Sequence, residues 1–279
     1  MIPARVLDVL RCPVCEQPLV EGDGALRCAS RHSFDVARQG YVNLLAGKGR
    51  RASTADTAEM VSARAAFLAA GHYQPLVDVL TSVAADVTDP DGIVLDAGAG
   101  TGHYLAAVLD RLPSAVGLAL DVSTFALRRA ARAHPRLGAV VWDVWDRLPI
   151  ASGAISLVLD VFAPRNAEEF HRVLRPGGGL VVVTPNRSHL AELVRPLGLV
   201  SVDERKDERL EAALGEYVTA RSREPVEWPL RLDRATAGQV VRMGPSAHHV
   251  PAETLRAGLE RLGDTIEVTA SVTVHVYRS

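Results

Sequence analysis

The sequence predicts an α/β protein with a mostly parallel, doubly wound sheet and a small N-terminal zinc-binding domain. Short apolar segments alternate with segments of helical spacing from residue 93 onward, which is typical of a parallel sheet covered by helices on both faces. The first of these apolar segments leads into a glycine-rich loop at residues 98–102. All three cysteines lie within the first 28 residues, at a spacing that suits a tetrahedral metal ion.

Length and composition indicate a globular protein with a sizeable core, because 48% of the 279 residues are hydrophobic. No apolar run approaches the ~20 residues that span a bilayer, and the start lacks the apolar segment of a signal peptide. We therefore expect a cytoplasmic protein without membrane contact. The net charge of −2 gives no general attraction to nucleic acid. Residues 1–55 carry eight basic and five acidic side chains, which suits either a phosphate-binding face or a solvated one.

The N-terminal ligand candidates form two close pairs. Two residues separate Cys12 from Cys15, and three separate Cys28 from His32, which suits one tetrahedral zinc ion. A disulfide framework does not suit three cysteines in a reducing compartment. Four protein ligands leave no open position, so we expect a structural ion that replaces the core such a short segment lacks. A redox pair or unliganded thiols are the alternatives.

The chain after this module predicts an extended segment at residues 34–45 and a loop at 46–56. The loop carries Lys48, Arg50 and Arg51. Helices are predicted at residues 57–70 and 76–87, and Pro75 suits the first turn of the second.

The α/β pattern then predicts strands at residues 93–97, 116–120, 139–142, 155–159 and 180–184, and helices at 103–112, 123–133, 167–174 and 189–197. A ligand of such a sheet binds at the carboxyl ends of the strands, beside the first one. Beyond residue 202 we expect a solvated charged segment at 203–211 and a loop with His248 and His249, which lack metal-ligand spacing. A final strand with alternating apolar residues is predicted at 265–277.

The glycine-rich loop predicts the type of ligand. Asp96 ends the first strand, and Gly98, Gly100 and Gly102 follow, where glycine permits positive φ and a close approach of the ligand. Asp121 ends the second strand, where a carboxylate can accept hydrogen bonds from both ribose hydroxyls. A dinucleotide site reads G-x-G-x-x-G, whereas D-x-G-x-G-x-G resembles motif I of class I, Rossmann-like S-adenosylmethionine-dependent methyltransferases. A dinucleotide enzyme and a purely structural turn are the alternatives.

Two more strand ends carry candidate residues. Asp143 follows the third strand, where an acid in this fold often meets the adenine amino group, and a plain loop aspartate is the alternative. Asp160 ends the fourth strand and is a candidate general base or a structural aspartate.

The whole chain resembles the RlmA-type 23S rRNA (guanine-N1)-methyltransferases, and more closely their Gram-positive, actinobacterial branch, which includes the tylosin-resistance methyltransferases. The segments that carry the resemblance are Cys12-Pro-Val-Cys15 with Cys28 and His32, Phe34-Asp35, Gly40-Tyr-Val-Asn-Leu-Leu45, Ala70-Gly-His-Tyr73, Leu95-Asp-Ala-Gly-Ala-Gly-Thr-Gly102, Val161-Phe-Ala-Pro-Arg-Asn166 and Met243-Gly-Pro-Ser246. Their order spans most of the chain.

This resemblance implies an enzyme that binds S-adenosylmethionine and one structural Zn²⁺ ion, the latter on Cys12, Cys15, Cys28 and His32. It also implies donor contacts at Tyr73, Gly100, Thr101 and His189, which residue spacing alone does not select. The implied substrate is a guanine in a hairpin loop of domain II of 23S rRNA, methylated at N1, with an effect on susceptibility to tylosin-type macrolides. Homodimers occur in the family.

The resemblance further implies a division of the chain into three parts. Residues 1–45 would form a zinc-binding, RNA-recognition domain, residues 46–75 a linker loop and helix, and residues 76–279 the methyltransferase domain. Phe162 and Pro164 would shape a pocket for a flipped guanine, and the basic loop would grip RNA phosphates. A class I methyltransferase for a small molecule or protein, and an inactive zinc-bearing RNA-binding protein, are the alternative functions.

Overall fold

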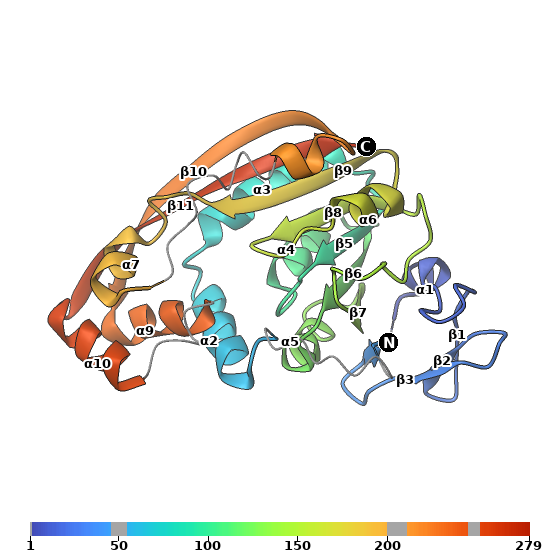
Figure 1. The fold of residues 1–279 in the computed structure, drawn as a ribbon, viewed down its shortest axis with the longest axis horizontal. Helices are drawn as coiled ribbons and strands as arrows, with labels where there is room; N and C mark the ends of the chain where they lie inside the picture. The colour runs from blue at the N-terminus through green and yellow to red at the C-terminus, as the bar shows by residue number, and fades with distance from the viewer. Residues whose placement is uncertain (1, 46–54, 200–210, 245–251) are drawn as a thin grey trace.

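The computed structural model describes residues 2–45, 55–199, 211–244 and 252–279. Its centre is an eight-stranded sheet with the strand order β10-β11-β9-β8-β5-β6-β7-β4 (Figure 1). Neighbours from β4 to β9 pair in parallel, and β11 pairs antiparallel with both β9 and β10. The predicted α/β class with a mostly parallel sheet is confirmed.

The strands of this sheet are β4 (Tyr41–Asn43), β5 (Ile93–Ala97), β6 (Val116–Asp121), β7 (Leu137–Val141), β8 (Ile155–Val161), β9 (Leu174–Pro185), β10 (Thr219–Asp233) and β11 (Thr265–Arg278). A separate antiparallel sheet contains β1 (Val20–Gly22), β2 (Ala25–Arg27) and β3 (Ser33–Asp35). The helices are α1 (Ala4–Val9), α2 (Ala58–Ala69), α3 (Gln74–Val87), α4 (His103–Arg111), α5 (Thr124–Ala130), α6 (Ala167–Val173), α7 (Ala191–Leu197), α9 (Arg234–Met243) and α10 (Ala252–Arg261).

Helices cover both faces of the large sheet and bury an apolar layer on each. One layer joins β5 and its neighbours to α2, α3, α4 and α5, and continues to α7, α9 and α10. The other layer lies under α1 and α6 and includes the buried residues of the N-terminal segment. The central strands are buried along their whole length, which explains why they read as continuous apolar runs.

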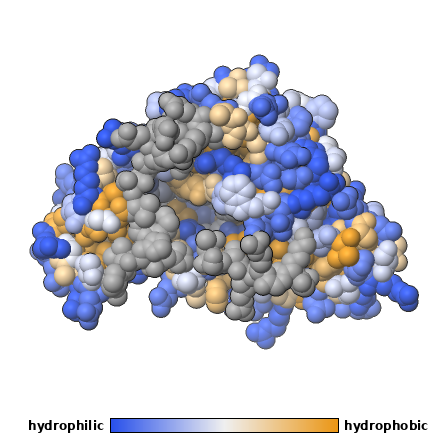
Figure 2. Space-filling view, in the orientation of Figure 1, coloured by the Kyte–Doolittle hydropathy of each residue, from blue (hydrophilic) through white to orange (hydrophobic). Residues whose placement is uncertain are grey.

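The strand order reverses at β5. The chain goes from β5 through α4 to β6 and through α5 to β7, then returns to β8 on the opposite side of β5. Adjacent connections that leave a sheet in opposite directions open a crevice at the carboxyl ends of the strands. Figure 2 shows a hollow near the centre of this face of the molecule, where β5 and β8 end in Figure 1.

The N-terminal segment docks directly on the large sheet. Helix α1 packs beside β6 and β7, and a Cβ added to Gly138 would lie 3.1 Å from Ile2 and 3.4 Å from Val6. The N–H of Arg11 donates to the Pro149 carbonyl oxygen (2.8 Å), and the N–H of Ala151 donates to Val9 (2.9 Å). No α-helix forms between β7 and β8, so the N-terminal segment covers the face that a crossover helix would otherwise cover.

The C-terminal part of the fold was not predicted beyond its last strand. β10, α9 and α10 lie where the sequence pattern is weak. β10 and β11 form a long antiparallel pair that extends past β9 toward α7, α9 and α10 (Figure 1). β10 carries Pro225 and Pro229 and exposes most of its charged residues. Proline is tolerated there because β10 is an edge strand.

Several predicted boundaries are wrong by a few residues. β7 begins two residues before the prediction, and α7 begins at Ala191 because Leu190 adopts a left-handed conformation. β9 begins at Leu174, six residues before the predicted strand at 180–184, and its pairing with β8 has an irregular register between Ile155 and Leu157. The extended segment at 34–45 contains the last two residues of β3 and all of β4, which joins the large sheet beside β7.

Some predictions lie outside the described residues. They are the basic loop with Lys48, Arg50 and Arg51, most of the charged segment at 203–211, and the loop with His248 and His249. The three-part division at residues 45 and 75 stays a prediction. No described helix combines the length and apolar character that crossing a membrane requires.

Adding a side chain at Gly138 tests how α1 is docked. We expect Gly138→Val to lower the free energy of unfolding by about 2 kcal/mol, because the new side chain would push Ile2, Pro3 and Val6 off β7. Urea unfolding measures the loss, and limited proteolysis should cut the N-terminal segment faster. Gly22→Ala is the control, since nothing lies within 4 Å of the added carbon. Equal stability of the two variants would contradict this docking.

Candidate active site and metal centre

The four predicted metal ligands lie together. The ligand atoms of Cys12, Cys15, Cys28 and His32 are all within 4.8 Å of one another. His32 Nδ1 is 3.5 Å from Cys12 Sγ and 3.3 Å from Cys28 Sγ, and the sulfurs of Cys15 and Cys28 are 3.6 Å apart. Tetrahedral zinc with ordinary bond lengths holds neighbouring sulfur and nitrogen ligands about 3.6–3.8 Å apart. The cluster therefore fits a zinc ion with a closed coordination sphere.

Tight turns bring the two ligand pairs together. In the first pair the N–H of Glu16 donates to the Cys12 carbonyl oxygen (2.8 Å), and in the second the N–H of Arg31 donates to that of Cys28 (2.9 Å). Glu16 and Arg31 both adopt positive φ. Gln17 joins the turns, because its Oε1 accepts hydrogen bonds from both the N–H and the hydroxyl of Ser30 (3.1 Å each).

The thiols of this cluster differ in acidity. The N–H of Gln17, with help from His32, lowers the pKa of Cys15 to about 6, whereas burial raises the pKa of Cys12. A bound cation favours the thiolate form at every position of such a cluster. The donor set is therefore one that a metal ion would complete.

The glycine loop adopts the backbone that the sequence predicts. Gly98, Gly100 and Gly102 have φ values of 82°, 53° and 76°. A Cβ on Gly98 would lie 2.5 Å from the Cβ of Ala163, and one on Gly102 would lie 3.1 Å from Ala130. Thr101 is buried between them. Glycine is therefore required both by the left-handed backbone and by the close approach of neighbouring segments.

Asp121 holds this loop against β6. Its Oδ2 accepts a hydrogen bond from the N–H of Gly100 (2.8 Å), and its Oδ1 accepts one from the N–H of Ser123 (2.7 Å). The N–H groups of Gly98 and Ala99 both donate to the carbonyl oxygen of Leu120, at 2.8 and 2.9 Å. Burial raises the pKa of Asp121. Asp121, which is predicted to bind the ribose of the donor, thus lies beside the glycine loop, which is predicted to bind the methionyl part of the same molecule.

Asp96 is a buried acid, and one of its carboxyl oxygens lacks a hydrogen-bond partner among the described residues. This atom is Oδ2, which is itself buried. Burial, with a smaller contribution from Asp121, raises the pKa of Asp96 to about 8. A cationic group in the crevice would supply the missing partner. S-adenosylmethionine carries a sulfonium and an ammonium group, so this site fits the predicted donor.

Sequence reasoning did not select Arg64 as a site residue, although its side chain lies against the glycine loop. It is the only basic residue of α2, and its Nη1 would be 3.5 Å from a Cβ on Gly100. Arg64 forms an ion pair with Asp56 and donates to the carbonyl oxygen of Met243 (2.6 Å). The Asp56 carbonyl oxygen in turn accepts the Ser123 hydroxyl (2.7 Å). These contacts tie α2 and α9 to the loop, and a lone arginine among the apolar residues of a helix was the available signal.

Tyr73 and His189 meet although 116 residues separate them. The Tyr73 hydroxyl lies 3.2 Å from His189 Nε2. His189 Nδ1 accepts the N–H of Ser271 (3.1 Å), so Nε2 is the nitrogen that can donate to Tyr73. Burial raises the pKa of Tyr73, which keeps its hydroxyl neutral. Trp228 packs edge-on against the Tyr73 ring at 5.4 Å, a contact that sequence reasoning missed.

Phe162 extends this aromatic group toward solvent. Its ring centroid lies 6.3 Å from that of Tyr73 and 6.0 Å from that of His189, and its side chain is 39% exposed. Phe162 adopts a φ of 56°. A left-handed conformation is costly for a bulky residue and here aims the ring toward Tyr73 and His189 instead of along β8.

The two other strand-end aspartates differ in exposure. Asp143 is partly buried, and its Oδ1 accepts the N–H of Trp145 (3.0 Å). Asp160 is fully buried, and its Oδ1 lies 3.5 Å from Arg165 Nε. The roles of these residues, like the other predicted donor contacts, stay predictions.

Comparison with known proteins matches two parts of the chain to families. Residues 10–52 match the family described as RlmA, N-terminal, whose model is a zinc ribbon. Residues 94–178 match the family described as methyltransferase domain. The first match contains the cysteine and histidine cluster, and the second contains the glycine loop and both β5 and β8.

Relatives match almost the entire chain. A 23S rRNA (guanine(748)-N(1))-methyltransferase of Streptomyces fradiae is 50% identical, with 98% of each chain covered. A protein of Micromonospora griseorubida named as a 23S rRNA (guanine-N(1)-)-methyltransferase is also 50% identical, again with 98% of each covered. A Bacillus subtilis relative named for the same activity, YxjB, is 32% identical over 66% of this chain.

Solved structures share the fold. The MccD protein matches with a TM-score of 0.50 and 16% identity, covering 72% of this chain and 96% of its own. A chain from the complex of the Haloferax volcanii Trm112 methyltransferase activator with a methyltransferase also has a TM-score of 0.50, at 17% identity, covering 80% and 99%.

Metal analysis tests the cysteine and histidine cluster. We expect one zinc ion per chain and its loss in Cys28→Ser, because three ligands do not close the tetrahedron. The same variant should lose amide protection across residues 10–35, since metal binding supplies the folding free energy of this segment. Elemental analysis and hydrogen exchange measure the two effects. Ser30→Ala, which removes a hydroxyl beside the cluster, should keep its zinc; full zinc in Cys28→Ser would contradict the assignment.

The pH dependence of donor binding tests Asp96. With a pKa of about 8 the free protein holds this carboxyl protonated at neutral pH, and a cationic ligand binds its ionised form better. Affinity for S-adenosylmethionine should therefore rise up to about tenfold per pH unit from pH 6 to 8 and level off above. Calorimetry in buffers of different ionisation enthalpy should detect proton release on binding.

Asp96→Asn should bind more weakly and lose most of this dependence. Asp110→Asn is the control, because Asp110 is an exposed residue of α4 and should behave as the wild type. A wild-type affinity that is constant from pH 6 to 9 would remove Asp96 from the site.

Proposed function

Because the chain belongs to the family of 23S rRNA (guanine-N1)-methyltransferases, we propose that it methylates N1 of one guanine in a hairpin loop of domain II of 23S rRNA. The equivalent of guanine 748, named for the Streptomyces fradiae relative, is the proposed target. The observation that carries the proposal is 50% identity over 98% of both chains, which includes the zinc cluster and the crevice together. Relatives with other substrates, the malonyl-[acyl-carrier protein] O-methyltransferases, match only 36–47% of this chain.

The enzyme is an S-adenosylmethionine-dependent methyltransferase with one structural zinc ion. The donor supplies an electrophilic methyl group on a sulfonium, so the protein's main task is to position donor and base in line. The residues that do this are proposed from their place at the carboxyl ends of the strands.

We assign the donor to the crevice beside β5. The loop from Gly98 to Gly102 would pack on its methionyl part, and the carboxylate of Asp96 would face its positive charge. Asp121 is placed to accept hydrogen bonds from the ribose hydroxyls while it keeps those from Gly100 and Ser123. Asp143 would meet the adenine, and Tyr73 with His189 would close the end of the site near Phe162.

The guanine would enter beside Phe162 and Pro164, at the end of β8. Guanine N1 carries a proton, which must leave when the new bond to carbon forms. Asp160 is the proposed acceptor because it ends β8, and Arg165 would then compensate the charge of its carboxylate in a buried place. The exposed face of Phe162 gives the base an aromatic surface to stack on.

The proposed RNA-recognition part is the zinc lobe, residues 1–45, which contains the cysteine and histidine cluster. Arg31, at the second ligand pair, and Arg38 are exposed there, where arginine suits phosphate contacts. The basic loop with Lys48, Arg50 and Arg51 would add to this surface. A homodimer, implied by the family resemblance, is also proposed, and analytical ultracentrifugation would detect it. Altered macrolide susceptibility is the proposed consequence for the cell.

Primer extension on a transcript of the domain II hairpin tests the function. A methyl group on N1 blocks Watson–Crick pairing, so reverse transcriptase should stop next to the target after incubation with enzyme and S-adenosylmethionine. The stop should be absent when S-adenosylhomocysteine replaces the donor, and when the target guanine is changed to adenine. Methyl transfer to the RNA without a stop would mean that another atom is methylated, and no transfer to this hairpin or to intact 23S rRNA would reject the proposal.

A further inference from the structure

Trp145 is the exposed one of three tryptophans. Its side chain is 65% exposed, while Trp142 and Trp228 are buried. It lies two residues after Asp143, in the segment that joins β7 to β8. A large aromatic surface in water contributes nothing to folding, and tryptophan is the residue most often used as a binding anchor.

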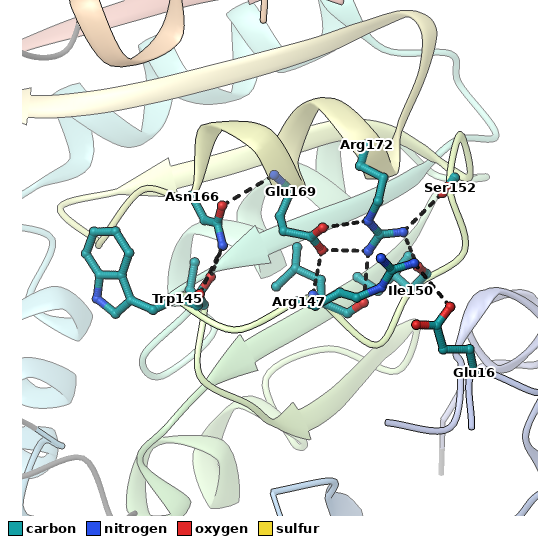
Figure 3. Close-up of polar contacts among 10 residues, drawn as sticks. Glu16, Trp145, Arg147, Ile150, Ser152, Asn166, Glu169 and Arg172 are labelled. Atoms are coloured by element: carbon teal, nitrogen blue, oxygen red, sulfur yellow. Dashed lines mark hydrogen bonds and ion pairs between the residues drawn. The ribbon is translucent and has the colours of Figure 1, made fainter. Parts of the chain in front are cut away.

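The backbone of Trp145 is held on both sides. Its N–H donates to Asp143 Oδ1 (3.0 Å). Asn166 Nδ2 donates to the carbonyl oxygens of Trp145 (3.2 Å) and Val144 (3.1 Å) (Figure 3). Asn166 also caps the N-terminus of α6. The indole therefore projects from a fixed backbone.

A partly buried ion pair between Glu169 and Arg172 fixes the rest of this segment. Glu169 Oε2 accepts the N–H of Leu148 (2.6 Å), and the guanidinium of Arg172 donates to the carbonyl oxygens of Leu148 (2.9 Å) and Ile150 (2.8 Å). Glu169 and Arg172 hold each other with two hydrogen bonds of 2.6 and 2.7 Å (Figure 3). Because these contacts already order the backbone around Trp145, a ligand that binds the indole loses little affinity to ordering of this segment.

Trp145 also lies between the two functional parts of the molecule. On one side, Asp143 follows the carboxyl end of β7, and Asn166 ends the segment that begins with Val161 and Phe162 at the carboxyl end of β8. On the other side, Arg147 donates to Glu16 of the first metal-binding turn (3.1 Å; Figure 3). We therefore expect an RNA that contacts both the zinc lobe and the crevice to pass near this indole.

We propose that Trp145 is a stacking surface for an unpaired base of the hairpin loop, next to the guanine that enters the crevice. This inference rests on the proposed function. Sequence-specific RNA recognition targets single-stranded loops, whose splayed bases stack on aromatic side chains. Asp143 and Asp146 flank Trp145, so the site disfavours a phosphate and suits the uncharged face of a base.

Kinetics with the hairpin transcript test the stacking. Trp145→Ala should raise the KM for RNA about tenfold, and Trp145→Phe should retain most of the affinity, because a smaller ring still stacks. The KM for S-adenosylmethionine should not change. Phe125→Ala is the matched control, since Phe125 is an exposed aromatic residue of α5 at 43%, and it should behave as the wild type.

Tryptophan fluorescence distinguishes stacking from a purely structural role of Trp145, because only stacking predicts that RNA quenches the emission of this residue. The transcript should quench the emission of the wild type, and Trp145→Phe should lose this quenching while still binding RNA. The inference is overturned if RNA binding and quenching are unchanged in the variants. It is also overturned if Trp145→Ala weakens donor binding instead, as an adenine contact would, or changes the oligomeric state, as an interface between copies would.

The outcome for the proposed function is separate. A transcript that the wild type binds with quenching but does not methylate would reject the proposed target and leave the stacking intact. A transcript that is methylated equally well by the wild type and by Trp145→Ala would support the proposed target and reject the stacking. Absence of any binding to the hairpin by the wild type would reject both.

Discussion

The structure depends on the close passage of the loop from Gly98 to Gly102 between the carboxyl end of β6 and the segment that follows β8. Two successive N–H groups of the loop share the carbonyl oxygen of Leu120, and a third reaches Asp121. Ala163, from the segment after β8, presses on the other side of Gly98. A side chain there would separate three strand ends at once. The crevice at the carboxyl ends of β5, β6 and β8 surrounds this contact, and Asp121 takes part in it directly.

Much of this site could be predicted because the deciding signals are local. The glycines at the left-handed positions of the loop, the acid at each strand end and the spacing within each metal-ligand pair can each be recognised from a few neighbouring residues. The contact between Tyr73 and His189 has no such signal, because β11 must first hold His189 through Ser271. Family resemblance supplied these two residues, and neither it nor spacing supplied Arg64 or Trp228.

The parts of the fold that could not be predicted are those set by tertiary contacts. β10 has the proline and charge content of a loop, and it becomes a strand because β11 offers it a long edge. α1 is too short to be stable alone and forms against β7, where Gly138 leaves room. The segment after β7 needs no helix of its own because α1 occupies that face. In each case the deciding partner lies far away in the sequence.

The attachment of the zinc lobe has a consequence for substrate choice. Hydrogen bonds from Arg11 and Ala151 join it to the segment after β7, and Glu16 and Arg147 add a contact between their side chains. Because the lobe is attached at several points, it does not move relative to the large sheet. The distance between the lobe and the crevice is therefore fixed. In the proposed RNA-recognition role of the lobe, this fixed separation would restrict the enzyme to RNAs that can reach the lobe and the crevice at the same time.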